Sequence, residues 1–543
     1  MKKRSNFIVQ GSILAIAGVL SRIIGIIRRF PMEHIIGDKG NGFYSAAYEV
    51  YALMLIISCY SLPLAVSKVV SSKVSRKQYK SAERAFRCAM VFAIVAGGIT
   101  FFVCEVFGDF LAKDLMLEPM SALALKVLGP ALLLVSVMGV LRGYFQGLGT
   151  MMPPAVSQVL EQIFVLIGSL VGASLLFQYG EGVGVLRHNE DFAPSFGAAG
   201  ASVGPVVGSL IGLLFLMFVY SIYRKKFKRQ ISRDVSGKTD TYGQVFKLII
   251  MTVLPVLLST TVYNLSNVID IRIYNSVMIQ KGFDSVRTYN WGVYSGKYKV
   301  LVNVPIALAN AMCSSIVPVL AALMVREEFG RAKERINQAM RFTMLVAIPS
   351  AVGLAVLARP IITMLFRGEI DMAVNLLHIG SISVVFYTMS TLTNGVLQGI
   401  NKMQIPVRNA VIALVIHIAF LYATLQFGWG IHAVVYANIL FAVIVCILNA
   451  LAIKKYLNYR QEYIRTFVIP VIASVIMGVV IGVLNLLLAK VIGNVLTVFL
   501  GIGIGVIVYF VVLILLKGIS EHDLKSMPGG RTVLTVAKRL RLM

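Results

Sequence analysis

The chain has 543 residues, of which 58% are hydrophobic and only 14% are charged, and its mean hydropathy is +0.82. Soluble domains are about half apolar and about a quarter charged, so this composition excludes a soluble globular protein, a disordered chain and a coiled coil. Lys and Arg number 51 against 24 Asp and Glu, a formal charge of +27. Such an excess fits nucleic acid, an anionic membrane surface or an anionic substrate, and the positions of the charges must decide among them.

Apolar segments long enough to cross a bilayer, which takes about 20 residues, recur along the whole chain. They are long and continuous, so they predict helices rather than the alternating strands of an outer-membrane barrel. The linkers are too short for a soluble catalytic domain. The predicted fold class is an all-α integral membrane protein with about 14 transmembrane helices, near residues 7–29, 42–66, 86–112, 122–147, 154–178, 194–222, 246–273, 290–323, 340–366, 372–398, 405–428, 431–453, 464–488 and 491–516.

The basic start at Met1–Arg4 resembles the flank of a signal peptide, but the apolar run after it is too long, and we expect an uncleaved first span. If the N-terminus is cytoplasmic, the strongly basic loops at 68–87 and 224–247 lie on the cytoplasmic side, and the more acidic loop at 179–193 lies opposite. This positive-inside pattern explains most of the charge without nucleic acid. Binding of lipid headgroups by the same loops stays open as an addition.

The two halves of the chain resemble each other. Gly143, Gln146, Gly147 and Pro154 recur 252 residues later, as Gly395, Gln398, Gly399 and Pro406. An even number of spans in each repeat predicts two six-helix lobes related by a parallel repeat, with the substrate site between them and two extra C-terminal helices. The predicted organisation is an N-lobe at 1–222, a basic cytoplasmic linker at 223–245, a C-lobe at 246–456, two further spans within 457–518, and a cytoplasmic tail at 519–543.

Charged residues inside the first span are the main candidates for a site. Arg22 lies deep in this span, and an arginine at mid-membrane costs about 2.5–3.5 kcal/mol on insertion scales, so it should face a cavity or a partner. Gly18, Arg22, Gly25 and Arg29 share one helical face, and Arg28 lies beside it. Arg28 and Arg29 are closer to the end of the span, so they could instead simply reach the interface.

The second half contributes polar residues in its first two spans. Asn267 and Asp270 lie in the seventh span, where Asp270 is either a structural ion-pair partner or a cation or proton site. Lys297 and Lys299 enter the eighth span and suit a phosphate ligand, unless the span begins at Val300 and both lysines are at the surface.

Two glutamates, Glu49 and Glu161, lie within spans and are either counter-ions for arginines or groups that titrate in a proton-coupled cycle. The sequence contains no P-loop, zinc-protease or serine-hydrolase motif, and the five cysteines have no metal-ligand spacing. The candidate substrate-binding residues are Arg22, Arg28, Arg29, Lys297, Lys299, Asn267 and Asp270, the coupling or counter-ion candidates are Glu49, Glu161 and Asp270, and metal ligands are unknown.

A family resemblance follows from motifs in the same order along nearly the whole chain. Ser21, Arg22, Gly25 and Arg28 precede the glycine-rich segment 37–42 and then Tyr48-Glu49-Val50-Tyr51, with later matches at Leu62-Pro63, Gln146-Gly147, Gln158 to Gln162, Leu301 to Pro305 and Ser315 to Pro318. The chain resembles the SpoVB/YtgP branch of the polysaccharide-biosynthesis exporters. These belong to the multidrug/oligosaccharidyl-lipid/polysaccharide (MOP) flippase superfamily, which also contains the MurJ-type lipid II flippases.

The resemblance implies a two-lobed bundle of fourteen helices around a V-shaped cavity. Arg22 and Arg28 match essential arginines of MurJ-type flippases, whereas Lys297 and Lys299 match a charged cluster only in kind. It also implies a flippase that moves a polyprenyl-pyrophosphate-linked saccharide, in particular lipid II, by alternating access. We therefore expect a non-enzymatic, monomeric protein of the bacterial plasma membrane with both termini cytoplasmic, without cofactor, and coupled to membrane potential, sodium or protons.

Alternative functions are judged by what each would need in the sequence. An exporter of another lipid-linked polysaccharide unit would need the same features. A MATE-like drug antiporter should have acidic, aromatic cavity walls, and a membrane polyprenyl-phosphate glycosyltransferase should have clustered carboxylates at one membrane face. A scaffold for envelope assembly would have little use for buried arginines.

Overall fold

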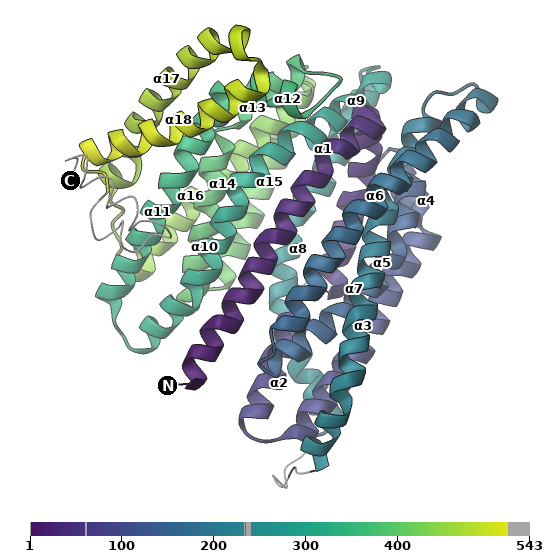
Figure 1. Ribbon diagram of the computed structural model, residues 1–543, viewed down its shortest axis with the longest axis vertical. Helices are drawn as coiled ribbons and strands as arrows, with labels where there is room; N and C mark the ends of the chain where they lie inside the picture. Colours follow the sequence, from purple (N-terminus) through teal and green to yellow (C-terminus); the bar gives the residue numbers. More distant parts are fainter. Residues whose placement is uncertain (1, 60–61, 233, 235–239, 520–543) are drawn as a thin grey trace. The chain divides into compact units, whose positions relative to one another are not determined.

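The computed structural model describes residues 2–59, 62–232, 234 and 240–519, and every regular element in these ranges is a helix (Figure 1). The α-helices are α1 (Lys2–Cys59), α2 (Leu62–Ser75), α3 (Tyr79–Val106), α4 (Gly108–Phe110), α5 (Ala122–Gly147), α6 (Met152–Arg187), α7 (Phe192–Ser232), α8 (Tyr242–Gln280), α9 (Asp284–Val293), α10 (Lys299–Val325), α11 (Phe329–Val356), α12 (Ala358–Leu365), α13 (Asp371–Gly380), α14 (Ser383–Gly399), α15 (Gln404–Gln426), α16 (Ile431–Leu457), α17 (Ile469–Ile492) and α18 (Asn494–Leu515). Short π or 3-10 turns connect some of them: η1 (Leu111–Leu115), η2 (Pro119–Ser121), η3 (Tyr294–Tyr298) and η4 (Ile464–Val468).

Ten helices in the described part of the chain are long and apolar enough to cross a membrane, or eleven if α13 and α14, which meet at a 46° bend, form one span. This confirms an all-α integral membrane protein. The number fourteen stays a prediction, partly because the first two predicted spans both overlap one long apolar stretch, Ile16–Ser75.

Packing divides the chain into two compact units, Met1–Gly292 (unit 1) and Val293–Met543 (unit 2). Helix α8 belongs to unit 1, where it packs against α1, α2 and α3. The predicted lobes place this helix in the second half of the chain. The two divisions differ because a sequence repeat reflects similarity between segments, whereas a compact unit is defined by which helices are in contact. The predicted lobe boundaries therefore stay a prediction.

Glycines bring α6 and α7 together in the centre of unit 1. Gly200, Gly204 and Gly208 recur at every fourth position of α7 and so share one face. A Cβ at any of the three would collide with backbone or side-chain atoms of α6. Small residues at this spacing let membrane helices approach closely, and α1 packs against both members of the pair.

Helix α1 is broken at Gly37, which has φ 66° and ψ −178°. This region of backbone space is essentially restricted to glycine. The Asn41 side chain donates to the Gly37 carbonyl oxygen at 3.1 Å and so satisfies a backbone acceptor released by the break. The chain thus changes direction between the two spans without a long loop.

In unit 2, α10 packs on α14 and α11, and α14 packs on α16. The last two helices form a hairpin, yellow in Figure 1, that rests on α11 and α12. Gly505 of α18 lies where a Cβ would strike Ile481 of α17, so this glycine packs helices together.

Candidate functional site

Arg28 lies in the interior of unit 1, with only 7% of its surface exposed. Its Nη1 donates to Ser169 Oγ at 2.8 Å and to Tyr44 Oη at 3.4 Å. Ser169 in turn donates to the Ala201 carbonyl oxygen of α7 at 2.8 Å. The close α6–α7 approach therefore fixes the hydroxyl that holds the arginine.

The break in α1 is needed for this arrangement. Arg28 and Tyr44 are 16 residues apart in one helix, and that much straight helix spans about 24 Å. Their contact is possible only because the chain turns at Gly37. A single glycine therefore links the local backbone to the geometry of the buried arginine.

The charge of Arg28 is not neutralised by a carboxylate in the described part of the chain. Its Nε is also buried without a hydrogen-bond partner there. A buried ion without a partner is strongly unfavourable, whereas an anion bound beside it would supply the missing charge and acceptor. The arrangement is thus chemically suited to holding an anionic group.

The other two arginines of this span have different surroundings. The Arg29 guanidinium lies 5.4 Å from the Tyr44 ring centroid and 5.8 Å from that of Tyr48, which is cation–π geometry. Arg22 is exposed. A Cβ at Gly25, three residues after Arg22, would lie 3.6 Å from Gln162 Oε1 of α6, so this face approaches a polar side chain. The interfacial alternative does not describe Arg28, which stays inside unit 1.

Glu161 is engaged within unit 1. It accepts from Arg142 Nη2 at 2.7 Å, and Arg142 Nε donates to Ser157 Oγ at 2.9 Å. The two ion-pair side chains are 15% and 17% exposed. Glu49 is half-buried and also interacts within the chain. Their proposed part in coupling stays a prediction.

Two charged residues of α8, Asp270 and Arg272, do not pair with each other. Asp270 is 1% exposed. Arg272, two residues later, donates instead to the carbonyl oxygens of Asp114 and Leu115 at the end of η1. Asn267 is half-buried. The substrate role of Asn267 and Asp270 stays a prediction.

In unit 2, Lys297 is fully buried within the π turn η3. Its ammonium donates to the Glu369 carbonyl oxygen at 3.0 Å and to that of Arg367, in the segment that links α12 to α13. Lys299 is half-buried at the first residue of α10. In this structure Lys297 stabilises backbone carbonyls, and its role as a phosphate ligand stays a prediction.

A second buried ion pair, which the sequence did not reveal, lies outside the spans. Glu118 accepts from Arg287 at 2.5 Å and from the Thr288 hydroxyl at 2.6 Å. Burial raises the pKa of the Glu118 carboxyl above its ordinary value, against the opposing effect of Arg287. The pair ties α9 to the start of η2 in unit 1.

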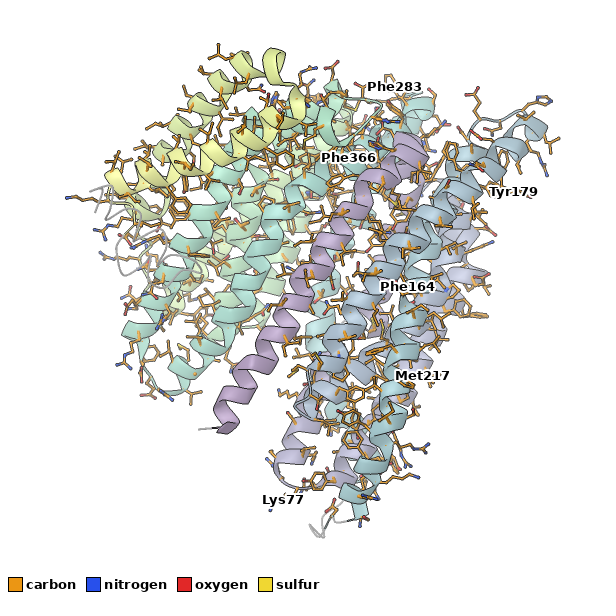
Figure 2. The ribbon with its side chains drawn as sticks, viewed as in Figure 1. Lys77, Phe164, Tyr179, Met217, Phe283 and Phe366 are labelled. Carbon is orange, nitrogen blue, oxygen red and sulfur yellow. The ribbon has the colours of Figure 1, made fainter. Side chains whose placement is uncertain are left out.

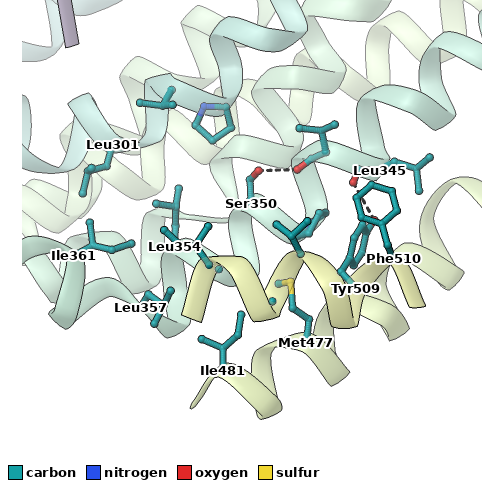
Figure 3. Close-up of a pocket in the computed structure, with 18 residues that line it drawn as sticks. Leu301, Leu345, Ser350, Leu354, Leu357, Ile361, Met477, Ile481, Tyr509 and Phe510 are labelled. Atoms are coloured by element: carbon teal, nitrogen blue, oxygen red, sulfur yellow. Dashed lines mark hydrogen bonds between the residues drawn. The ribbon is translucent and has the colours of Figure 1, made fainter. Parts of the chain in front are cut away.

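Unit 2 contains an apolar groove of about 510 Å³ between α10, α11, α17 and α18 (Figure 3). Pro305, Gly353, Leu357, Met477 and Phe510 are among its lining residues. Its polar groups are largely satisfied from within: Ser350 donates to Val346 O, and Tyr509 donates to Leu345 O at 2.9 Å. An aliphatic chain fits such a surface better than a polar ligand does.

No cluster of three or more metal-ligating side chains occurs among the described residues. The partners of Arg28 and Glu161, namely Ser169, Tyr44 and Arg142, were missed from the sequence. The four-residue spacing of glycines on α7 is a signal for a close helix pair, but it does not say which hydroxyl faces which arginine.

Comparison with known proteins places these features in a family. Residues 8–324 match the model of the polysaccharide biosynthesis protein family, and residues 300–423 match the MatE model. Lipid II flippase MurJ of Bacillus subtilis (strain 168) is 26% identical over 427 residues, 76% of each chain. Stage V sporulation protein B of the same organism is 24% identical over 477 residues, 86% of this chain and 88% of that protein. A solved lipid II flippase MurJ in an inward closed conformation superposes with a TM-score of 0.58 at 17% identity, covering 92% of this chain and 97% of its own.

Proposed function

Since the chain belongs to the polysaccharide biosynthesis protein family, within the MOP superfamily of flippases and transporters, we propose that it is a flippase for a polyprenyl-pyrophosphate-linked saccharide, in particular lipid II. The saccharide lipid would pass from the inner to the outer leaflet of a bacterial plasma membrane by alternating access. The protein would act as a monomer with both termini in the cytoplasm, as the positive-inside pattern favours.

The observation that carries this proposal is the buried, unneutralised guanidinium of Arg28. It is held by two hydroxyls and leaves one N–H without an acceptor in the described part of the chain. A pyrophosphate would provide both the charge and the acceptors, through charge-assisted hydrogen bonds. Arg22 and Arg29, on the same helix, would extend the cationic surface, with Lys297 and Lys299 as further candidates after a conformational change.

The apolar groove of unit 2 supports the lipid part of the proposal. Its aliphatic and aromatic walls suit a polyprenyl chain, because such walls are about as apolar as the lipid tails that the chain would leave. The saccharide would be moved while the chain stays in a lipid-like environment, which avoids the cost of exposing it to water.

No nucleotide motif is present, so we propose that transport is coupled to membrane potential, sodium or protons. A net positive site that crosses the membrane would respond to a negative-inside potential by about 2.3 kcal/mol per charge per 100 mV. Glu49, Glu161 and Asp270 are the proposed candidates if protons or sodium take part.

A second candidate function is a drug antiporter of the same superfamily, which the match of residues 300–423 to the MatE model favours. A transporter of cationic drugs would need a carboxylate at its site. Arg28 lies instead among hydroxyls, and Glu161 is committed to Arg142. An exporter of another lipid-linked polysaccharide unit would use the same chemistry as the proposed flippase and differs only in the sugar.

Reconstitution tests both the function and the role of Arg28. Liposomes containing the purified protein and labelled lipid II should expose the label on the opposite leaflet, faster under a membrane potential. Arg28→Gln should abolish most of this movement while the protein still inserts, whereas Arg187→Gln, at an exposed helix end, should leave it unchanged. If lipid II stays in place but another lipid-linked sugar moves, the substrate assignment is wrong; if none moves, the flippase proposal is wrong.

A further inference from the structure

Two helices of unit 1 carry exposed apolar stripes that run toward the same end of the unit. On α7, Leu210, Leu214 and Met217 are 41–52% exposed and lie on the face opposite the glycines that meet α6. Figure 2 labels Met217 on this helix and Lys77 at the turn between α2 and α3. Such a stripe on a membrane helix is the surface that lipid chains cover.

On α3 the corresponding stripe consists of Val91, Val95 and Phe102, which are 54–60% exposed. The buried face of the same helix carries small residues such as Ala89 and Ala93. The stripe therefore follows from the helical period, with small residues toward the protein and large apolar residues away from it.

Each apolar stripe continues directly into basic residues. Arg224 and Lys228 follow Met217 by 7 and 11 positions, so they lie on the same face of α7. Arg87 and Lys80 precede Val91 by 4 and 11 positions and continue the stripe of α3 in the same way. All four basic side chains are exposed.

The distance along the helix from the apolar stripe to the basic residues is long enough to pass from the hydrocarbon core of a bilayer into its headgroup layer. Seven helical residues separate Met217 from Arg224 and correspond to about 10 Å along the axis. The polar headgroup layer on each side of a bilayer is about 5–7 Å thick, so this distance is long enough to reach it from the hydrocarbon core. The basic side chains thus lie where the phosphates of the lipids covering the stripes would be.

The two basic ends form one surface. The rings of Phe86 on α3 and Tyr220 on α7 lie 5.4 Å apart, one position before Arg87 and one turn before Arg224. The Lys80 backbone N–H also donates to the Asp234 carboxylate at 2.7 Å, which holds this residue, two positions after α7, at the start of α3. We define the α3–α7 basic patch as Lys80, Arg87, Arg224, Lys228 and Arg229.

The acidic residues around this patch are already engaged. Glu83 pairs with Arg87 at 2.5 Å, and Asp240 pairs with Lys73. In contrast, Arg224, Lys228 and Arg229 form no ion pair within the described residues. Orientation by the positive-inside rule needs only that a loop be basic. It does not require basic residues that extend lipid-facing stripes on two neighbouring helices.

From these observations we propose that the α3–α7 basic patch binds the phosphates of anionic phospholipids whose acyl chains cover the two stripes. The ligand is an anionic glycerophospholipid of the surrounding bilayer, not the transported saccharide lipid. Binding is electrostatic at the headgroup and apolar along the chains, so it should be sensitive to salt.

The test measures lipid selectivity by electron paramagnetic resonance of the full-length protein in phosphatidylcholine membranes. Spin-labelled phosphatidylglycerol should be enriched at the protein over spin-labelled phosphatidylcholine. The triple variant R224Q/K228Q/R229Q should lose roughly fivefold in relative association for each charge removed, if all three contact phosphate. The charge-conserving variant R224K/R229K should keep the enrichment.

A matched control removes three basic residues elsewhere. R331Q/K333Q/R335Q changes the net charge equally, but in α11, where Arg331 pairs with Glu328 at 2.8 Å and Arg335 donates to Gln338. This control should keep the enrichment, and high salt should lower it in the wild type. Equal enrichment in the patch triple variant and the wild type would overturn the proposal. So would an equal loss in both triple variants, or displacement by inorganic phosphate at constant ionic strength, which would indicate a site for free phosphate.

Discussion

Replacing Gly37 by alanine tests whether the break in α1 creates the buried arginine site. Gly37 has φ 66° and ψ −178°, in a region that residues with a Cβ almost never occupy. No atom lies within 4 Å of the position that a Cβ would take. Steric overlap with neighbours therefore contributes nothing, and the whole effect comes from backbone strain.

The strain at such a position is of the order of 1–3 kcal/mol. The chain can relieve it by straightening toward helix, but Tyr44 then moves away from Arg28, and the loss of a hydrogen bond to a charged group costs about 1.5–3 kcal/mol. The chain will relax by whichever route costs less free energy, so Gly37→Ala should lower the free energy of unfolding by about 1–3 kcal/mol. Transport should fall more than stability does, because either relaxation displaces the arginine.

The assay combines thermal unfolding of the purified protein with lipid II movement in liposomes. Gly98→Ala is the matched control, because Gly98 lies in the middle of α3 and also has no atom near its Cβ position. In an ordinary helix this change should be neutral or stabilising by up to about 1 kcal/mol. If Gly37→Ala unfolds and transports like Gly98→Ala, the break is not fixed by backbone conformation and the reasoning fails.

Three further predictions follow from the contacts of individual residues. Glu161→Gln should destabilise the protein by about 1.5–3 kcal/mol because half-buried Arg142 loses its charged partner and keeps only Ser157. The double variant R142Q/E161Q should recover part of that loss on unfolding, and transport by it would argue against a coupling role for Glu161. Because the pKa of Glu118 is raised, the folded chain keeps a proton on this carboxyl at higher pH than the unfolded chain does. The free energy of unfolding should therefore decrease as pH rises from 4.5 through the raised pKa. Melting temperatures measured against pH should show this slope, and Glu118→Gln should remove it. Gly353→Phe should fill the open space beside the apolar groove. Equilibrium binding should then show weaker binding of long-chain lipid II analogues and unchanged binding of short-chain ones. Gly98→Phe, the control, should change the binding of neither kind of analogue.

Much of the fold was predictable because it depends on local composition. The cost of exposing backbone groups to lipid forces long apolar segments into helices, so hydropathy alone predicts an all-α membrane protein. The family assignment followed from ordered motifs around Arg22 and Arg28, and the match to the family model confirmed it.

The surroundings of the candidate residues were less predictable. Arg28 and Arg29 are neighbours in sequence, yet one is buried against Ser169 and the other lies over tyrosine rings. Lys297 is a plausible phosphate ligand by composition, but its ammonium is bound to backbone carbonyls here. Periodicity places a side chain on a face of its helix, but it does not identify the helix that the face will meet.

By itself, the sequence determined that this protein resides in a membrane, that its spans are helices, which orientation to expect and which family it belongs to. These properties depend on residue types and on their spacing within single segments. Only the tertiary structure decided that Arg28 lies among hydroxyls, with no carboxylate beside it in the described part of the chain, and that basic residues of α3 and α7 extend two exposed apolar stripes. Both depend on contacts between residues far apart in the chain, such as Arg28 with Ser169 and Phe86 with Tyr220. The +27 charge of the chain thus separates into a buried part suited to an anionic substrate and a surface part suited to the membrane.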